Sequence, residues 1–288
     1  MTNSFKEKLG QGGYGEVYKG KLLDGRLVAV KFLNASKGNG EEFINEVASI
    51  SKTSHVNIVT LLGFCLEGHK RALIYEFMPN GSLEKFTYKD NPSQPTPHLK
   101  WEKLLQISIG IARDICPKIA DFGLAKLCPR KDSIISMTNA RGTIGYIAPE
   151  VYNRNFGGVS SKSDVYSYGM MILEMVGGRK NIKVGVSRTS EIYFPDWIYK
   201  HLKLGSNLPL WEDITNEENE IARKLIMVGL WCIQNKQSDR PSMSKVIEMM
   251  EGSFEALHIP PNPSMFSPES PERLPNELLA ESSTTSVE

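Results

Sequence analysis

The sequence predicts an α+β protein in which a small, strand-rich N-terminal part precedes a larger helical part. Two observations support this fold class. Up to about residue 77 most apolar residues alternate with polar ones, as in half-buried strands, and a single segment has helical spacing. Beyond the breaker Pro79-Asn80-Gly81 the apolar residues recur at helical spacing.

Four runs in the N-terminal part are typical of strands. Residues 15–19 and 27–32 flank the turn Leu23-Asp24-Gly25, which predicts a hairpin. Residues 58–64 and 72–77 are two further strand-like runs.

Helices are predicted where apolar residues share one side. Residues 41–51 form the single N-terminal helix. The later helices are expected at residues 99–113, 163–176, 192–202, 218–234 and 243–251. Residues 258–288 are rich in Pro, Ser and Glu, so we expect a disordered tail there.

Composition excludes several classes of protein. The 288 residues carry a net charge of +1, which indicates neither nucleic acid nor an anionic membrane as the main partner. The four cysteines match no zinc or redox spacing. No run reaches the ~18 apolar residues of a membrane helix, and the N-terminus has no secretory pattern. We therefore expect a cytoplasmic chain without a membrane segment.

A glycine-rich segment suggests phosphate binding. Residues 10–17 contain G-x-G-x-x-G-x-V, with Gly10, Gly12, Gly15 and Val17 at the defined positions. Glycines allow a backbone turn to approach phosphates closely. The motif joins two predicted strands and is not followed by a helix, which argues against a dinucleotide-binding fold.

Two charged motifs extend this pattern. Val28-Ala29-Val30-Lys31 ends a strand, and Glu46 follows 15 residues later on the predicted helix. A lysine that neutralises phosphates needs a carboxylate to hold it. Asp121-Phe122-Gly123 follows a short strand-like run, and its aspartate is suited to Mg²⁺. Ala148-Pro149-Glu150 lies 27 residues further on.

Together these motifs resemble those of protein kinases, from about residue 5 to residue 257. The resemblance implies a two-lobed fold, with an N-lobe at 1–78, a hinge at 76–81 and a C-lobe at 82–257. It implies that ATP and Mg²⁺ are bound. The residues that it assigns to the nucleotide are Gly10, Gly12, Gly15, Val17, Ala29, Lys31, Glu46, Tyr75 as gatekeeper, and Glu76 and Met78 in the hinge.

The same resemblance assigns other roles. Asp121 would bind Mg²⁺, Glu150 would pair with Arg240, and Asp164 would brace the catalytic loop. Gly142-Thr143 resembles the substrate platform of Ser/Thr kinases. Ser133, Ser136 and Thr138, between the two tripeptides, are candidate phosphorylation sites, and solvated loop polarity is the alternative.

Finer details resemble plant receptor-like kinases of the leaf-rust-resistance type, for example Tyr75-Glu76-Phe77-Met78-Pro79-Asn80-Gly81-Ser82-Leu83 and Ser163-Asp164-Val165-Tyr166-Ser167-Tyr168-Gly169. Full-length members of that group are single-pass plasma-membrane proteins with this domain in the cytosol. The resemblance therefore implies a protein substrate or a partner kinase.

The catalytic loop of the family is missing. Kinases carry H-R-D-L-x-x-x-N about 18 residues before the D-F-G aspartate, and here residues 103–120 contain no such motif. Ala112-Arg113-Asp114 is the nearest match, but Asp114 lies only seven residues before Asp121. We therefore expect a deletion of roughly 30 residues near 113–116, relative to the family pattern.

Three interpretations remain open for this chain. It is an impaired Ser/Thr kinase, a kinase-like module that binds nucleotide or a partner kinase without catalysis, or a truncated product without a role. Loss of the base removes typically 10²–10⁴-fold in rate. We also expect Asp164 to be a buried charge without its usual partner, which is destabilising.

Overall fold

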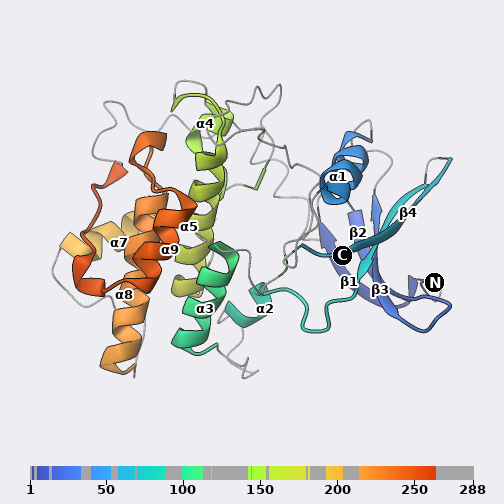
Figure 1. Ribbon diagram of the computed structural model, residues 1–288, viewed down its shortest axis with the longest axis horizontal. Helices are drawn as coiled ribbons and strands as arrows, with labels where there is room; N and C mark the ends of the chain where they lie inside the picture. Colours follow the sequence, from blue (N-terminus) through green and yellow to red (C-terminus); the bar gives the residue numbers. More distant parts are fainter. Residues whose placement is uncertain are drawn as a thin grey trace. The chain divides into compact units, whose positions relative to one another are not determined.

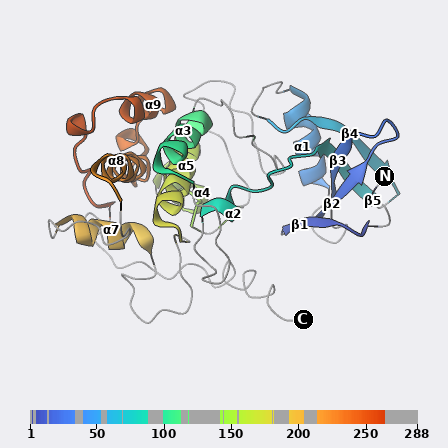
Figure 2. The same ribbon diagram turned by 90° about the horizontal axis from the view of Figure 1, so that it is seen from below.

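The computed structural model describes residues 2, 5–12, 15–33, 40–52, 58–68, 70–87, 99–112, 118, 142–143, 145–153, 156–179, 181, 193–203 and 214–263. The chain divides into two compact units, residues 1–130 and residues 131–288. Figures 1 and 2 show strands together with helices in the first unit, and helices in the second. This arrangement confirms the α+β fold class with a strand-rich N-terminal part.

The first unit contains a five-stranded antiparallel sheet, in the order β1-β2-β3-β5-β4. Its strands are β1 (Lys8–Gly12), β2 (Gly15–Lys21), β3 (Leu27–Leu33), β4 (Leu61–Glu67) and β5 (Lys70–Glu76).

The predicted hairpin is present, because Leu22 and Arg26 close the turn between β2 and β3 through a 2.9 Å backbone hydrogen bond. Gly25 occupies this turn at φ +90°, where other residues are strained. The strand predicted at 58–64 begins later, at Leu61. Just before it, the carbonyl oxygen of Thr60 accepts a hydrogen bond from the backbone N–H of Glu76, and its own N–H donates to Oε1 of Glu76.

Helix α1 (Glu41–Lys52) covers one face of this sheet (Figure 1). Its buried residues Phe43 and Ile50 pack with Val59, Leu73 and Tyr75. The opposite face buries a smaller group of apolar residues: Val28, Val30 and Ala72. Two further helices, α2 (Glu84–Thr87) and α3 (Trp101–Ala112), follow β5 along the chain.

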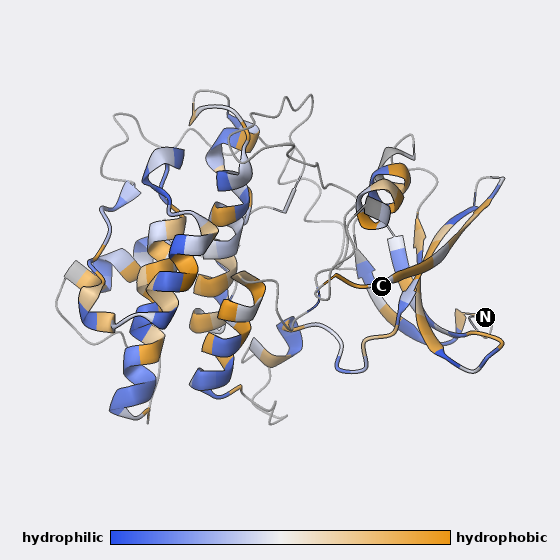
Figure 3. Ribbon diagram, in the orientation of Figure 1, coloured by the Kyte–Doolittle hydropathy of each residue, from blue (hydrophilic) through white to orange (hydrophobic). Residues whose placement is uncertain are grey.

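The second unit is helical, with α4 (Pro149–Tyr152), α5 (Ser161–Gly177), α7 (Phe194–Lys203), α8 (Asn216–Cys232) and α9 (Met243–Glu251). Short 3-10 helices lie at Gln237–Asp239 and Phe254–Ala256. Figure 3 shows that the hydrophilic first turns of α8 give way to hydrophobic residues further along the helix.

Helices α5 and α8 pack at close range. A side-chain carbon added at Gly169 of α5 would lie 2.5 Å from Cβ of Cys232 and 2.8 Å from the carbonyl oxygen of Gly229, both on α8. The fully buried Ile172, Leu173 and Leu225 belong to the same two helices. The missing side chain at residue 169 therefore sets how closely the two backbones approach.

Residues 252–263, here called the C-terminal strap, are held by hydrogen bonds to side chains. Trp231 donates to the carbonyl oxygen of His258 at 2.9 Å, and Tyr199 donates to that of Pro261 at 3.0 Å. Residues 258–263, which we expected to belong to a disordered tail, are thus fixed to helices α7 and α8. Residues 264–288 lie outside the described part of the chain.

None of the helices that the structure describes has the length and apolar character needed to cross a bilayer.

Candidate functional site

Lys31 and Glu46 meet in the interior of the first unit. Lys31 lies on β3, paired with Val17 of β2 and Leu73 of β5, so it occupies the centre of the sheet. Its Nζ lies 3.0 Å from Oε2 and 3.3 Å from Oε1 of Glu46 on α1. Lys31 is 8% exposed and Glu46 is fully buried. The pair therefore fixes α1 to the sheet and holds an ammonium group in a defined position.

Tyr75 shares the same carboxylate. Its hydroxyl donates a hydrogen bond to Oε1 of Glu46, and its side chain is buried. Tyr75 is opposite Ala29 on β3. Because opposed residues point to one face of a sheet, Tyr75, Ala29 and Lys31 all face α1. Sequence reasoning placed Tyr75 near the nucleotide but missed this hydrogen bond, which the alternation along β5 would have indicated.

The glycine-rich segment lies on β1 and β2, where Gly12 pairs with Gly15. Residues 13–14 of the intervening turn lie outside the described residues. A side-chain carbon at Gly15 would come within 2.0 Å of the carbonyl oxygen of Phe32, whereas one at Gly10 would meet nothing within 4 Å. Glycine is thus required at residue 15 because the neighbouring strand β3 leaves no space for a side chain there. The motif alone does not reveal this reason.

The segment expected to be the hinge begins at the end of β5. The backbone N–H of Gly81 donates to the carbonyl oxygen of Met78 at 3.2 Å, and Gly81 has φ +69°. Met78 is 37% exposed. The Pro79-Asn80-Gly81 breaker therefore forms a turn directly after the last strand.

Glu76 forms hydrogen bonds through its side chain as well as through its backbone. Its Oε1 accepts hydrogen bonds from Nζ of Lys118 at 2.5 Å and from the backbone N–H of Thr60 at 2.7 Å. Partial burial opposes ionisation, but these hydrogen bonds outweigh it and lower the pKa of Glu76. Lys118 lies three residues before Asp121, so this ion pair ties the end of β5 to the chain just before D-F-G.

The predicted metal ligand and phosphorylation sites cannot be placed. Asp121, Asp114, Ser133, Ser136 and Thr138 all lie outside the described residues. Within the described part, His, Cys, Asp and Glu side chains form no group of three or more suited to a metal ion.

In the second unit, Arg240 and Glu150 form a bidentate ion pair. Nη1 and Nη2 of Arg240 lie 2.7 and 2.8 Å from Oε1 and Oε2 of Glu150. Both residues are almost fully buried, at 1% and 2% exposure. Burial opposes ionisation of Glu150, but hydrogen bonds from Arg240 and Ser163 prevail and lower its pKa. The pairing expected from the sequence is present, and it joins the start of α4 to the segment before α9.

The remaining donors of Arg240 are also satisfied. Its Nε donates to the carbonyl oxygen of Gln234 at 2.6 Å, and its two Nη atoms also reach those of Lys162 and Asn235 at 2.9 and 3.1 Å. The ring of Tyr166 lies 5.0 Å from the guanidinium carbon. Such complete satisfaction is what a buried charge requires.

Asp164 differs from the expectation of a buried charge. Its side chain reaches solvent on the first turn of α5, although surrounding protein atoms partly desolvate the carboxyl and raise its pKa. No hydrogen bond or ion pair joins it to another residue in the described part of the chain. Its exposure avoids most of the penalty of a fully buried charge.

Gly142-Thr143, where we expected a substrate platform, is followed by a turn at residues 145–146. The backbone N–H of Tyr146 donates to the carbonyl oxygen of Thr143 at 3.0 Å, and its hydroxyl donates to Oε2 of Glu174 on α5. Asn181 also donates to that oxygen, at 3.3 Å. The motif analysis did not identify Glu174, because an isolated glutamate within a helix has no sequence signature.

The sheet with its buried lysine–glutamate pair, and the helical unit with its buried Arg–Glu pair, define a protein-kinase domain. Two family models agree: one described as protein tyrosine and serine/threonine kinase matches residues 3–116, and one described as protein kinase domain matches residues 99–250. The chain therefore belongs to the protein-kinase family.

Its relatives are plant receptor-like kinases. The chain is 53% identical over 309 residues to a PR5-like receptor kinase of Arabidopsis thaliana, which covers 96% of the chain and 46% of the relative. It is 51% identical over 316 residues to leaf rust 10 disease-resistance locus receptor-like protein kinase-like 2.5 of the same plant, covering 99% and 46%. Rust resistance kinase Lr10 of Triticum aestivum is 51% identical over 294 residues, covering 93% and 46%. The chain spans less than half the length of these relatives.

Proposed function

We propose that this chain is a receptor-like kinase domain that binds Mg-ATP but transfers phosphate poorly or not at all. The observation that carries the proposal is the buried Lys31–Glu46 pair in a chain whose sequence has no catalytic-loop motif. In the intact family form, the domain would phosphorylate Ser or Thr of a protein substrate.

The residues of the first unit fit a nucleotide. An ammonium held at 3.0 Å from a carboxylate is positioned to neutralise phosphate oxygens. The backbone at Glu76, the last residue of β5, and at Met78 would hold the adenine, and Gly10, Gly12, Val17 and Ala29 would surround the nucleotide. Bound Mg²⁺, held by Asp121, would neutralise charge on the phosphates.

The lengths of the alignments support a missing segment. The first alignment covers 96% of the 288-residue chain, which is about 276 residues, yet it runs over 309, about 33 more. The second covers 99%, about 285 residues, yet runs over 316, about 31 more. The match to the first family model also ends at residue 116, beside the proposed junction near 113–116.

The state of Asp164 is consistent with the same proposal. In the family this aspartate would brace the catalytic loop, and here it has no hydrogen-bonding partner within the described residues. The sequence has no H-R-D-L-x-x-x-N motif, whose aspartate in the family accepts the proton of a substrate hydroxyl.

Thermal unfolding with and without Mg-ATP tests nucleotide binding. A ligand at 100 times its dissociation constant stabilises the folded state by about 2.7 kcal/mol, so we expect a clear rise in the melting temperature. The rise should largely disappear in Lys31→Met and persist in Lys70→Met, which changes an exposed lysine of the same sheet. A wild-type chain that does not respond to Mg-ATP would refute the nucleotide proposal.

A further inference from the structure

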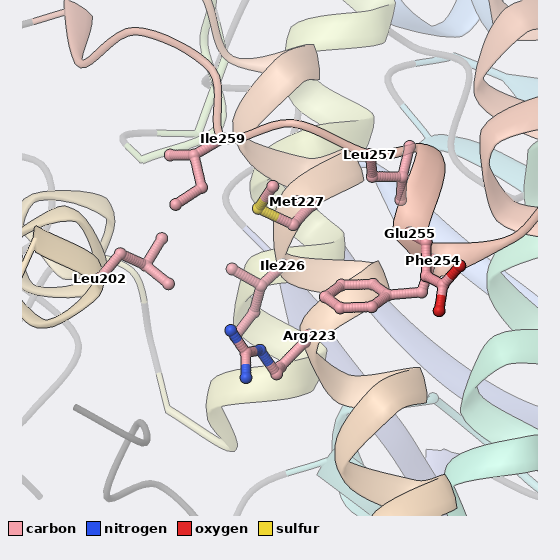
Figure 4. Close-up of a pocket in the computed structure, with 8 residues that line it drawn as sticks. All are labelled: Leu202, Arg223, Ile226, Met227, Phe254, Glu255, Leu257 and Ile259. Carbon is pink, nitrogen blue, oxygen red and sulfur yellow. The ribbon is translucent and has the colours of Figure 1, made fainter. Parts of the chain in front are cut away.

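An apolar pocket lies in the second unit, apart from the residues discussed so far. It has a volume of about 290 Å³ and opens between α7, α8 and the C-terminal strap (Figure 4). Its apolar wall is formed by Leu202 of α7, Ile226 and Met227 of α8, and Leu257 and Ile259 of the strap. The volume is close to the lower end of the range for ligand pockets, about 300–1,000 Å³.

The wall formed by the strap is anchored on both sides of the pocket. Before the pocket residues, Lys224 donates to the carbonyl oxygen of Gly252 at 2.8 Å. Between and after them, the hydrogen bonds from Trp231 and Tyr199 hold His258 and Pro261. The pocket is therefore a preformed feature of the fold, since closing it would require several of these bonds to break.

The pocket has opposite charges at its two ends. The guanidinium of Arg223 lies 5.6 Å from the centre of the Phe254 ring. In Figure 4 this ring separates Arg223 from the carboxylate of Glu255. Neither charged group forms an ion pair within the described part of the chain. A ligand with an aliphatic group and a neighbouring carboxylate would therefore be favoured at the Arg223 end and disfavoured at the Glu255 end.

We propose that this pocket binds the chain's own segment 277–281, Glu-Leu-Leu-Ala-Glu. Two leucines supply the aliphatic group, and Glu277 supplies the carboxylate for Arg223.

The connection along the chain permits this contact. The strap ends at Pro263, four residues after the pocket residue Ile259. The 13 residues 264–276 can span at most about 45 Å when fully extended, which far exceeds the return to a pocket that the strap itself lines. A tethered segment has an effective concentration in the millimolar range, so weak pairing with an exposed arginine is sufficient for occupancy. The inference does not depend on nucleotide binding.

The methyl resonance of Met227 in the full-length chain, labelled with ¹³C at methionine methyls, reports on the pocket. We expect Leu278→Asp combined with Leu279→Asp to shift this resonance, because both leucines leave the pocket. Phe266→Asp combined with Leu274→Asp adds the same charge elsewhere in the tail and should leave the Met227 resonance unshifted. Glu277→Arg should shift the resonance too.

Two results would overturn the proposal. If the Met227 resonance is unchanged by the Leu278 and Leu279 substitutions, the tail does not occupy the pocket, whatever else binds there. A wild-type Met227 resonance that moves to the position of the double variant when the protein is diluted would mean that the tail of a second copy binds instead.

Discussion

Two buried ion pairs organise the chain at the level of single residues, and each depends on a third group. The carboxylate of Glu46 accepts a hydrogen bond from the hydroxyl of Tyr75 in addition to those from Lys31. The carboxylate of Glu150 accepts one from Ser163 in addition to those from Arg240. Sequence motifs predicted both pairs, but neither extra hydroxyl. A sequence motif identifies residues that share a function. The two additional hydroxyl donors belong to no motif with these carboxylates, and they lie beside them only because of strand register and helix packing.

Removing Glu150 should destabilise the second unit strongly. Glu150→Ala leaves the guanidinium of Arg240 buried without a counterion, and breaking a buried pair in this way costs about 3–5 kcal/mol. Urea unfolding measures the loss. Glu248→Ala is the control, because its partner Lys245 is exposed, and it should change stability by less than about 1 kcal/mol. Equal effects of the two substitutions would contradict the structural role of the buried pair.

The same carboxyl should contribute to the pH dependence of stability. The folded-state pKa of Glu150 is lowered from its ordinary value of 4.5, so the unfolded chain binds more protons in the window between the two values. The stabilisation is complete above pH 4.5 and is lost as pH falls through the folded-state pKa. Unfolding free energies measured across this window should fall more steeply in wild type than in Glu150→Gln; parallel curves would argue against the shift.

Tyr75→Phe should lower the stability of the first unit without leaving a cavity in its core. The substitution removes one hydroxyl that donates to a buried carboxylate, and hydrogen bonds to charged groups contribute about 1.5–3 kcal/mol. Urea unfolding, monitored by a signal from the first unit, measures the loss of unfolding free energy. Tyr152→Phe, at a tyrosine that is 44% exposed, is the control, and a Tyr75→Phe chain as stable as wild type would show that Lys31 alone satisfies Glu46.

At the level of elements, sequence periodicity located the long helices and strands within a few residues. Helix α9 occupies the predicted 243–251, since Ser242 caps it and Gly252 follows it. Helix α8 begins two residues before the predicted 218, because Thr215 and not an apolar residue defines its start. The short elements α2 and α4 were not predicted, since four residues are too few for a periodic pattern.

The cap of α8 gives a direct test of this boundary. Thr215 accepts a hydrogen bond from the backbone N–H of Glu218 at 3.2 Å, and Glu218 accepts one from that of Thr215 at 3.0 Å. Thr215→Ala should cost about 0.5–2 kcal/mol, measured by urea unfolding, and Thr215→Ser should retain most of the stability. Faster amide exchange confined to the first turn of α8 would accompany the loss; an unchanged first turn in Thr215→Ala would place the start of the helix elsewhere.

At the level of the whole molecule, the sequence predicted the fold class, the family and both ion pairs. It did not predict the strap, because Pro-rich composition suggests disorder while Trp231 and Tyr199 provide specific hydrogen-bond donors for its carbonyl oxygens. It also predicted burial of Asp164, whose side chain instead reaches solvent. That expectation came from the complete family pattern, and the chain lacks the motif that would cover this residue.

We propose that this domain binds Mg-ATP through the residues around Lys31 but has no aspartate to activate a substrate hydroxyl, because its sequence lacks the family's catalytic-loop motif. Absence of such a base lowers phosphoryl transfer by roughly 10²–10⁴-fold, from the 1–100 s⁻¹ typical of kinases.

Transfer of radiolabelled γ-phosphate, to the chain itself and to a generic protein substrate, tests this claim most directly. The wild-type chain and Lys31→Met are compared in Mg-ATP under identical conditions. We expect wild type to transfer label at least about 10²-fold more slowly than the 1–100 s⁻¹ typical of kinases. Transfer by wild type at 1–100 s⁻¹ that vanishes with Lys31→Met would contradict the claim and show that the domain catalyses transfer without the family's catalytic loop.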